Sequence, residues 1–363
     1  MIKYVDLGIS EDEYDKKISP LLKEIFLSGQ FVYEKQVQEF ENNFASYCGS
    51  KYAVALNSGT DALIFALKSL GIGQDDEVIT VSNSFIATAN AISYVGAKAI
   101  FVDIKDDLLI DSSKIEAAIT SKTKAIIPVH LMGLICDMNK ILDIAKKNNL
   151  FVIEDAAQSV GSKYNGKMSG TMSDIGCFSL HPLKNLSGVT DGGIVTTDNK
   201  EIATYIRQVR NHGLIDRDNQ NIVGRVSRLN SINAAILNYR LTKLDAIINR
   251  RRKMATLYDE QLKDISHISL IEVSSNNYHT YHTYIIKVTH RTDLQKYLLD
   301  NGIETKIHYP VLIHKQKPYF NANEHLENTQ TLSEKTLTLP VANVDEAEVI
   351  YICKTISDFY KTF

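Results

Sequence analysis

The sequence of 363 residues has no tryptophan, only six prolines and only four cysteines. No two cysteines form a CxxC pair, and their spacing matches no zinc framework. This pattern excludes a disulfide-stapled miniprotein, and it predicts reduced thiols and no metal site. The four cysteines are Cys48, Cys136, Cys177 and Cys353.

Long apolar runs and an excess of either charge are also missing. The longest apolar-rich run, residues 125–136, contains Pro128 and His130 and is too short to span a bilayer. Residues 1–6 lack the apolar segment that is typical of a signal peptide. The net charge is only −3, so the composition does not favour a nucleic-acid or anionic-membrane partner. We expect a cytoplasmic protein with neither kind of partner.

The composition is otherwise that of an ordinary globular protein, with 44% hydrophobic and 23% charged residues. A chain of this length is expected to form about two domains with ample material for a core. A short basic run, Arg250-Arg251-Arg252, follows a helical pattern, and we interpret it as a solvated helix face.

Short apolar runs alternate with helical stretches up to about residue 200. The runs at 78–81, 99–102, 125–129 and 151–153 are typical of strands, and the apolar residues of 137–149 fall on one helical face. Strand–helix–strand units build parallel sheets, and ligands collect at the carboxyl ends of the strands. We therefore predict an α/β fold whose large domain contains a mainly parallel sheet.

The pattern changes in the last third of the chain. Residues 230–262 are strongly helical, since leucine and isoleucine recur every three or four positions. A strand is predicted at 280–288 and a closing helix at 345–360. The predicted organisation is a large domain over residues 1–240, followed by a connecting helix and a small α+β domain over 241–363.

A first candidate site lies at residues 57–63, where small residues join a β-like run to a helical pattern. The start of a helix leaves backbone N–H groups free to bind an anion, and Thr60 adds a hydroxyl. This segment could therefore bind a phosphate. An ordinary helix N-cap would have the same sequence, and both interpretations stay open on this segment alone.

Two further candidates carry charge. Asp155 follows an apolar strand and could pair with a protonated ring nitrogen, whose pKa it would raise. Lys184 lies between a strand-like run and the glycine pair Gly192-Gly193, where burial would lower its pKa and make the amine nucleophilic. Taken singly, each is equally compatible with a structural aspartate or a surface lysine.

Together the three segments provide a phosphate anchor, a partner for a pyridine nitrogen and a lysine that can capture an aldehyde, which are the requirements of pyridoxal phosphate (PLP). Their order closely resembles the DegT/DnrJ/StrS family of PLP-dependent sugar aminotransferases. The resemblance covers nearly the whole chain. It is carried by Phe40-Glu41, by residues 58–63, 73–79, 154–158, 181–186 and 210–213, and by His308-Tyr309-Pro310.

The resemblance implies the aspartate aminotransferase fold, fold type I, and a role for each matching residue. Lys184 is implied to capture the aldehyde of PLP, and Asp155 to pair with its pyridine nitrogen. Gln158 is implied to lie near the phenolic oxygen. Phe85 is implied to stack on the ring, for which an aromatic side chain is suited, although a core position is an alternative for Phe85 alone.

The same resemblance implies that Gly59, Thr60 and Ser179 bind the phosphate of PLP. In the family, an asparagine from the neighbouring subunit also reaches this phosphate, but Val226 stands at that position and has no polar donor. We expect a nearby group, Arg228 among them, to replace it, with a structural ion pair as the alternative role of Arg228.

For the substrate, the resemblance implies that His308, Tyr309 and His314 lie near the mouth of the site. Histidine and tyrosine can form hydrogen bonds with sugar or phosphate oxygens. For His314 a purely structural role is the alternative.

The activity implied by the resemblance is transfer of an amino group from L-glutamate to a dTDP-linked keto-deoxysugar, for amino sugars of surface glycans such as lipopolysaccharide. Residues 181–186, with Asp191-Gly192-Gly193, favour members that aminate C3 of a dTDP-3-keto-6-deoxyhexose. A C4 aminotransferase of a nucleotide 4-keto-6-deoxysugar and a non-catalytic PLP-binding regulator stay open. A homodimer is also implied, and the apolar stripe at 237–248 could form its interface or pack within one chain.

Overall fold

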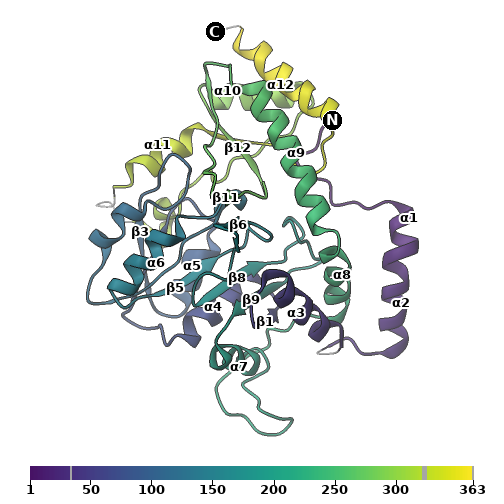
Figure 1. The fold of residues 1–363 in the computed structure, drawn as a ribbon, viewed down its shortest axis with the longest axis vertical. Helices are drawn as coiled ribbons and strands as arrows, with labels where there is room; N and C mark the ends of the chain where they lie inside the picture. Colours follow the sequence, from purple (N-terminus) through teal and green to yellow (C-terminus); the bar gives the residue numbers. More distant parts are fainter. Residues whose placement is uncertain (33–34, 321–324, 362–363) are drawn as a thin grey trace.

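The computed structural model describes residues 1–32, 35–320 and 325–361 (Figure 1). Its centre is a seven-stranded sheet in which the five neighbouring strands from β8 to β3 run parallel. Strand β9 is antiparallel to both its neighbours. In spatial order the strands are β1 (Tyr52–Leu56), β9 (Gly193–Thr197), β8 (Ile175–Ser179), β5 (Phe151–Asp155), β4 (Thr123–Ile126), β2 (Glu77–Val81) and β3 (Lys98–Val102).

Helices cover both faces of this sheet because its strands are apolar on both sides. In β1, Val54 packs on one face with α4 (Gly59–Ser69), while Ala53 and Ala55 pack on the other with α3 (Lys35–Cys48). Helices α5 (Ala87–Tyr94) and α7 (Lys200–Val209) join α4, and α6 (Met138–Lys147) covers the face opposite to theirs. The predicted fold class is confirmed.

The C-terminal part has its own core around a three-stranded antiparallel sheet. Its strands are β10 (Ile268–Ser269), β12 (Tyr284–Val288) and β13 (Thr336–Leu339), and its helices are α9 (Leu244–Leu262), α10 (Arg291–Asp300), α11 (Glu327–Lys335) and α12 (Glu346–Tyr360). A third, small sheet joins β11 (Asn277–Tyr278) to β6 (Lys163–Tyr164) and β7 (Lys167–Met168).

The helical region after residue 230 differs from its prediction. It forms two helices, α8 (Ser231–Leu241) and α9, which are separated at Thr242 and Lys243. The apolar stripe of this region packs inward, since Leu237, Leu244 and Ile248 are buried in one cluster with α3. The stripe therefore belongs to the core of a single chain and does not support a dimer interface.

The predicted domain division at residue 240 falls close to the end of α8 and stays a prediction. The first residues of the chain, however, lie on the C-terminal part: Ile2 pairs with Ile303, and the Tyr4 N–H donates to Glu304 at 3.1 Å. The predicted strand at 280–288 is shorter than expected, because only Tyr284–Val288 is extended in the sheet.

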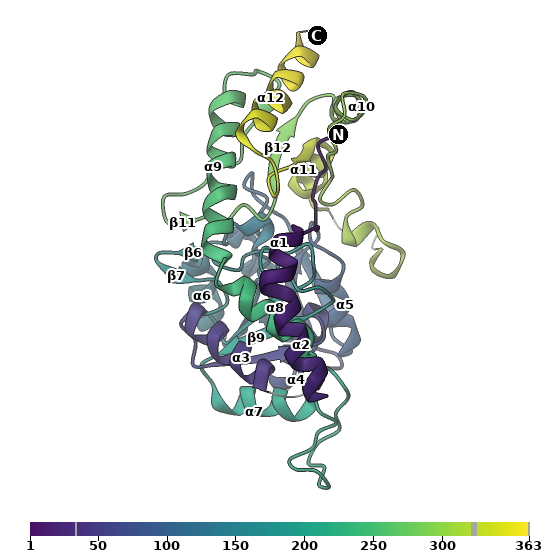
Figure 2. The same ribbon diagram turned by 90° about the vertical axis from the view of Figure 1, so that its right-hand side faces the viewer.

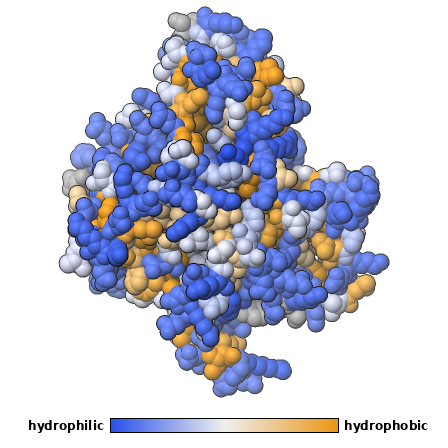
Figure 3. Space-filling model, viewed as in Figure 1, coloured by the Kyte–Doolittle hydropathy of each residue, from blue (hydrophilic) through white to orange (hydrophobic). Residues whose placement is uncertain are grey.

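Two segments project from the body (Figures 1 and 2). One is the arm formed by α1 (Glu11–Glu13), the π-helical turn Tyr14–Ile18 and α2 (Ser19–Ser28), which runs along the outside of α8. The other is the long connection between α7 and α8. Apolar surface is visible on both segments (Figure 3). The exposed apolar residues are Phe26 and Leu27 on the arm and Ile215 and Val223 on the connection. In the described residues, no helix is long and apolar enough to cross a bilayer.

Candidate active site

A cavity of about 480 Å³ opens between the carboxyl ends of the central strands and the C-terminal part. One side, which we call the sheet wall, consists of Gly59, Thr60, Asp155, Ser179 and Lys184. The opposite side, which we call the outer wall, consists of Tyr4, Arg251, Lys306 and His308. Phe85, Gln158 and Tyr309 also line the cavity. The structure thus brings together most of the residues that the sequence singles out.

Asp155 is the last residue of β5 and is almost fully buried. Its carboxylate accepts hydrogen bonds from the Thr88 hydroxyl at 2.7 Å and from the Ala157 N–H at 3.2 Å. Burial raises the pKa of Asp155 above its ordinary value, although both hydrogen bonds and the charge of Lys184 oppose this shift. A cation placed beside Asp155 would restore its ionised form.

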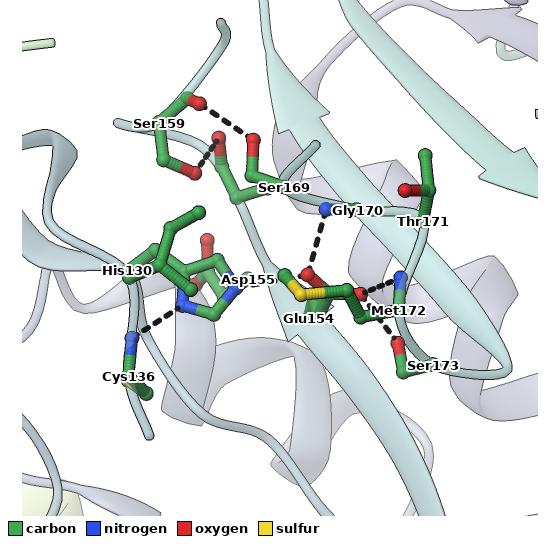
Figure 4. Close-up of polar contacts among 12 residues, drawn as sticks. His130, Cys136, Glu154, Asp155, Ser159, Ser169, Gly170, Thr171, Met172 and Ser173 are labelled. Carbon is green, nitrogen blue, oxygen red and sulfur yellow. Dashed lines mark hydrogen bonds and ion pairs between the residues drawn. The ribbon is translucent and has the colours of Figure 1, made fainter. Parts of the chain in front are cut away.

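Glu154 precedes Asp155 and points to the opposite face of the strand, where sequence reasoning assigned it no role (Figure 4). Its fully buried carboxylate accepts hydrogen bonds from the Gly170 N–H at 2.7 Å, the Met172 N–H at 2.9 Å and the Ser173 hydroxyl at 2.9 Å. These bonds tie β5 to the loop that leads into β8, and β8 carries the chain to Lys184.

His130 completes this network. Its Nδ1 accepts a hydrogen bond from the Cys136 N–H at 3.3 Å, which assigns the proton to Nε2, so that Nε2 donates to Glu154 at 3.0 Å. The backbone N–H of His130 donates to the carbonyl of Asp155 at 3.0 Å. Asp155 is therefore held from behind by a buried network. The residue that could have revealed this network in the sequence is Glu154, the acidic residue directly before Asp155.

Lys184 lies in a turn after β8, and its backbone N–H donates to the carbonyl of His181 at 2.8 Å. Burial lowers the pKa of Lys184 to about 8, while the nearby charge of Asp155 acts in the opposite direction. A lysine with this pKa is neutral, and thus nucleophilic, in a substantial fraction of molecules at physiological pH. This is the property that the sequence analysis required of it.

The start of α4 lies directly against β8. Ser58 caps the helix by accepting from the Asp61 N–H at 3.1 Å. A Cβ atom on Gly59 would lie 2.9 Å from Cβ of Ser179, and one on Gly193 would lie 2.1 Å from the carbonyl oxygen of Ser58. Glycine at both positions is what allows the N-terminus of α4 to reach the cavity, where its N–H groups and Thr60 fit a phosphate.

Three further residues fit a flat aromatic ligand. Gln158 accepts from the Met132 N–H at 2.8 Å and donates to the Tyr309 hydroxyl at 3.0 Å, so that both ends of its amide are fixed. The ring of Phe85 remains 57% exposed although it lines the cavity, and its centroid lies 6.2 Å from that of Tyr309. An exposed aromatic face inside a cavity is available for stacking.

On the outer wall, His308 bonds to the Thr338 hydroxyl through Nδ1 at 2.9 Å. Burial and the charges of Lys184 and Lys306 lower the pKa of His308 to about 4, so the imidazole is neutral at physiological pH. The interpretation of residues 250–252 as a solvated face is wrong for Arg251, which is only 7% exposed and lines the cavity. Periodicity identified the helix correctly but did not show that the segment before β12, whose Tyr281 and His282 carbonyls accept from Arg251, covers this side of it.

Two predicted residues lie outside the cavity. His314 is fully buried and bonds to the Ser82 hydroxyl through Nδ1 at 2.6 Å, which is a structural environment. Arg228 donates to the Asn211 side chain at 3.2 Å. Its predicted contact involves the cofactor of a neighbouring subunit and stays a prediction, as does the consequence of Val226, which is 48% exposed.

The cavity contains the parts of a PLP site: a buried aspartate, a lysine whose pKa is lowered, a helix N-terminus that can bind phosphate, and an exposed aromatic ring. A site of this kind in this fold class defines a fold type I PLP-dependent enzyme. A family model described as "DegT/DnrJ/EryC1/StrS aminotransferase family" matches residues 12–357. The chain belongs to this family.

Relatives and solved structures agree with this assignment. The chain is 40% identical to a dTDP-3-amino-3,6-dideoxy-alpha-D-galactopyranose transaminase of Aneurinibacillus thermoaerophilus, over 96% of this chain and 97% of the relative. It is 36% identical to a pleiotropic regulatory protein of Geobacillus stearothermophilus, over 100% of this chain and 99% of the relative. The crystal structure of DesV from S. venezuelae superposes with a TM-score of 0.96 at 32% identity, covering 99% of this chain and 98% of DesV.

Some solved structures similar to this chain contain PLP or its amine form, PMP. The predicted family, the aminotransferase class and the dependence on PLP are therefore confirmed. The roles of the individual site residues, the position of the keto group and the assembly of the chain stay predictions.

Proposed function

We propose that this protein transfers an amino group from L-glutamate to the C3 keto group of a dTDP-3-keto-6-deoxyhexose. The main support for this chemistry is that Lys184 and Asp155 line the same cavity, beside the start of α4. The choice of C3 rests on residues 181–186 and on the 40% identical relative, whose name specifies a dTDP-3-amino sugar.

In this proposal PLP, when bound, supplies an electron sink for the carbon that bears the transferred amine. Asp155 keeps the ring nitrogen protonated, and the N-terminus of α4 binds the phosphate. Lys184 would hold PLP through its amine, and with the donor bound that amine would move a proton at the α-carbon of the donor. Phe85 limits tilting of the ring, and Tyr309, fixed by Gln158, orients the sugar. The same residues act in reverse when the sugar accepts the amine.

Two alternatives have specific support. A C4 aminotransferase is favoured by 36% identity to the GDP-perosamine synthase of Escherichia coli O157:H7, over 89% of this chain and 90% of that enzyme. A non-catalytic regulator is favoured by the relative described as a pleiotropic regulatory protein. Lys184 argues against the second alternative, because a protein that only binds PLP does not need a lysine whose pKa is lowered to about 8.

We further propose a cytoplasmic homodimer whose product enters surface glycans. The support for the dimer is the exposed apolar side chains on the two projecting segments, of which Leu27 is 78% and Val223 is 91% exposed. Exposed apolar side chains that gather on projecting segments are typical of an interface. In a dimer the connection that carries Val226 could reach the cavity of the partner. Sedimentation of a stable, active monomer would contradict this part of the proposal.

The experiment that tests the activity uses purified protein, PLP and L-glutamate with three acceptors: a dTDP-3-keto sugar, a dTDP-4-keto sugar and a GDP-4-keto sugar. NMR of the product locates the new amine. The proposal predicts an amine at C3 with the first acceptor, and an amine at C4 would establish the alternative. Consumption of neither glutamate nor any acceptor would support the regulator.

A further inference from the structure

Two buried hydroxyl groups form a chain of hydrogen bonds with the carboxylate of Asp155. The Thr88 hydroxyl donates to Oδ2 of Asp155 at 2.7 Å, and the Ser84 hydroxyl lies 2.9 Å from that of Thr88. All three residues are buried, and all three line the cavity. The chain of hydrogen bonds therefore ends on the predicted partner of the cofactor ring nitrogen.

One short segment at the start of α5 supplies both hydroxyls. Thr88 lies in the first turn of α5, and its backbone N–H donates to the carbonyl of Phe85 at 3.2 Å. Ser84 lies four residues before Thr88, a spacing that brings two side chains together across one helical turn. Phe85 lies between them in sequence and exposes its ring in the cavity. The same segment thus offers a stacking face and a pair of hydroxyls to one cofactor ring.

The chain that leads from β2 into this segment is anchored on two sides. The side-chain N–H of Asn83 donates to the carbonyl of Leu108 at 2.8 Å, in the loop after β3. The Ser82 hydroxyl bonds to Nδ1 of His314, from the C-terminal part, at 2.6 Å. These contacts hold the backbone on which Ser84 is placed, so the hydroxyl of Ser84 is kept beside that of Thr88.

The charge of Asp155 determines the direction of the chain. An ionised carboxylate only accepts hydrogen bonds, so Thr88 donates its single hydroxyl proton to Asp155, and Ser84 then donates to the oxygen of Thr88. A protonated Asp155 that donated to Thr88 would reverse both bonds and leave Ser84 in need of an acceptor. Within the described residues, the Ser84 hydroxyl has no hydrogen-bond partner besides Thr88. The arrangement therefore favours the ionised form of Asp155.

This preference opposes the effect of burial. Burial raises the pKa of Asp155, and the hydrogen bond from Thr88 is the largest of the interactions that lower it. A carboxylate and a pyridine nitrogen share one proton, and a hydrogen bond donated to the carboxylate favours the state in which that proton is on the nitrogen. Without the Thr88 hydroxyl, the shared proton is expected to move toward Asp155 and leave the ring neutral.

We propose that Thr88 and Ser84 are positioning residues that keep the shared proton on the ring nitrogen of PLP, an inference that rests on the aminotransferase function and on the role of Asp155 proposed above. Thr88 acts on the carboxylate directly. Ser84 acts through Thr88, because a hydroxyl that accepts a hydrogen bond becomes a stronger donor. The effect of Ser84 is therefore the smaller of the two.

The test compares the native holoenzyme with its Thr88→Val, Thr88→Ser and Ser84→Ala variants. Thr80→Val is the matched control, since Thr80 is also fully buried but donates its hydroxyl to the carbonyl of Ile127 at 2.9 Å, outside the cavity. Each protein is loaded with PLP that is isotope-labelled at the ring nitrogen. Solid-state NMR then measures the chemical shift of that nitrogen, which differs between its protonated and unprotonated forms. Single-turnover kinetics with L-glutamate are measured in parallel.

We expect the ratio of protonated to unprotonated ring nitrogen to fall by about tenfold or more in Thr88→Val, as loss of a hydrogen bond to a charged group does. The single-turnover rate should fall with it. Ser84→Ala should move the nitrogen shift in the same direction by less, and Thr88→Ser, which retains a hydroxyl, should restore most of the native shift. Thr80→Val should leave the shift unchanged even where it lowers stability. An unchanged ring nitrogen in Thr88→Val would overturn the inference.

Folding and the proposed function give distinguishable outcomes. If Thr88→Val does not fold, Ser84→Ala provides the same test, and a native nitrogen shift in that variant would overturn the inference. If the native holoenzyme transfers no amine, the proposed activity fails, while a nitrogen shift that depends on Thr88 would still support the role of the two hydroxyls. Normal amine transfer with an unmoved ring nitrogen in both variants would contradict the inference alone. Failure of the native protein to bind PLP would overturn both.

Discussion

The two walls of the cavity differ in how their polar groups are satisfied. On the sheet wall, Asp155 is bonded on its own side and its strand is fixed from behind through Glu154 and His130. On the outer wall, the buried Nε of Arg251 has no hydrogen-bond partner among the described residues, and Lys306 is exposed. The network behind the sheet wall is bonded within the protein, whereas the outer wall has polar groups without a hydrogen-bond partner among the described residues.

This difference is what a two-substrate enzyme with one resident cofactor requires. The cofactor stays through both half-reactions, so its site can be rigid and preorganised. Donor and acceptor must alternate in the remaining space, and long side chains from separate segments can serve both.

The largest effect is expected for Lys184→Ala. The variant lacks the amine that captures PLP and moves the proton, so turnover should be lost while PLP still binds non-covalently. Absorbance of the bound cofactor and a coupled transamination assay measure the two effects. Lys167→Ala, at an exposed position outside the cavity, is the control. Transamination by Lys184→Ala at the native rate would show that this lysine is not the reactive one.

Asp155→Ala should lower the rate by about two to three orders of magnitude, in line with loss of other preorganised charges in active sites. The expected cause is that the ring nitrogen is no longer held in its protonated form. Single-turnover kinetics with glutamate measure the loss. A rate near that of the native enzyme would mean that another group protonates the cofactor.

Glu154→Gln tests the network behind the sheet wall. All four partners of this carboxylate are hydrogen-bond donors, so the amide nitrogen of glutamine would face a donor. We expect a loss of about 3–5 kcal/mol in the free energy of unfolding, as for other broken buried pairs. Denaturant titration measures it against Glu39→Gln, which alters an exposed pair with Lys35. Equal stabilities would remove Glu154 from the account.

A smaller effect is expected in the pH dependence of cofactor capture. Only the neutral amine of Lys184 reacts, and burial lowers its pKa to about 8. The rate at which the cofactor-free enzyme captures PLP should therefore rise with pH up to about 8 and level off above it. Asp155 raises this pKa, so Asp155→Asn should move the midpoint to lower pH. A rate that still rises steeply at pH 10 would indicate an ordinary exposed lysine.

The smallest effect is expected for Val226→Asn. We predict that a neighbouring arginine replaces the missing donor, so the added asparagine should change the Kd of PLP little, and Arg228→Ala should weaken it. Cofactor titration of both variants decides this point. If Val226→Asn clearly binds PLP more tightly and Arg228→Ala does not bind it more weakly, no group replaces the missing asparagine donor. Arg225, by contrast, forms an ion pair with Asp61 within the chain.

The sequence predicted the sheet wall far better than the outer wall, and the reason is physical. Asp155 ends one strand and Lys184 follows another, both strands have apolar runs that can be read locally, and parallel strands bring their carboxyl ends to one edge of the sheet. Arg251, Tyr4 and Lys306 come from segments far apart in the chain. Their meeting depends on how the C-terminal part packs, which no local pattern encodes.

The same dependence on distant contacts explains two other differences between the sequence-based predictions and the structure. His314 is a polar residue near a substrate motif, and only its contact with Ser82, 232 positions away in sequence, shows that it is structural. The break between α8 and α9 at Thr242 and Lys243 interrupts a periodicity that continues across it, because both helices contribute to one apolar cluster.

The most direct test of the central claim is to trap the cofactor on its lysine. Borohydride reduction of the holoenzyme, followed by peptide mass spectrometry, should place a pyridoxyl group on Lys184. Incubation with L-glutamate before reduction should prevent the label, because the amine has then been transferred and the lysine released. A label on another lysine, or a label on Lys184 that glutamate does not prevent, would contradict the account.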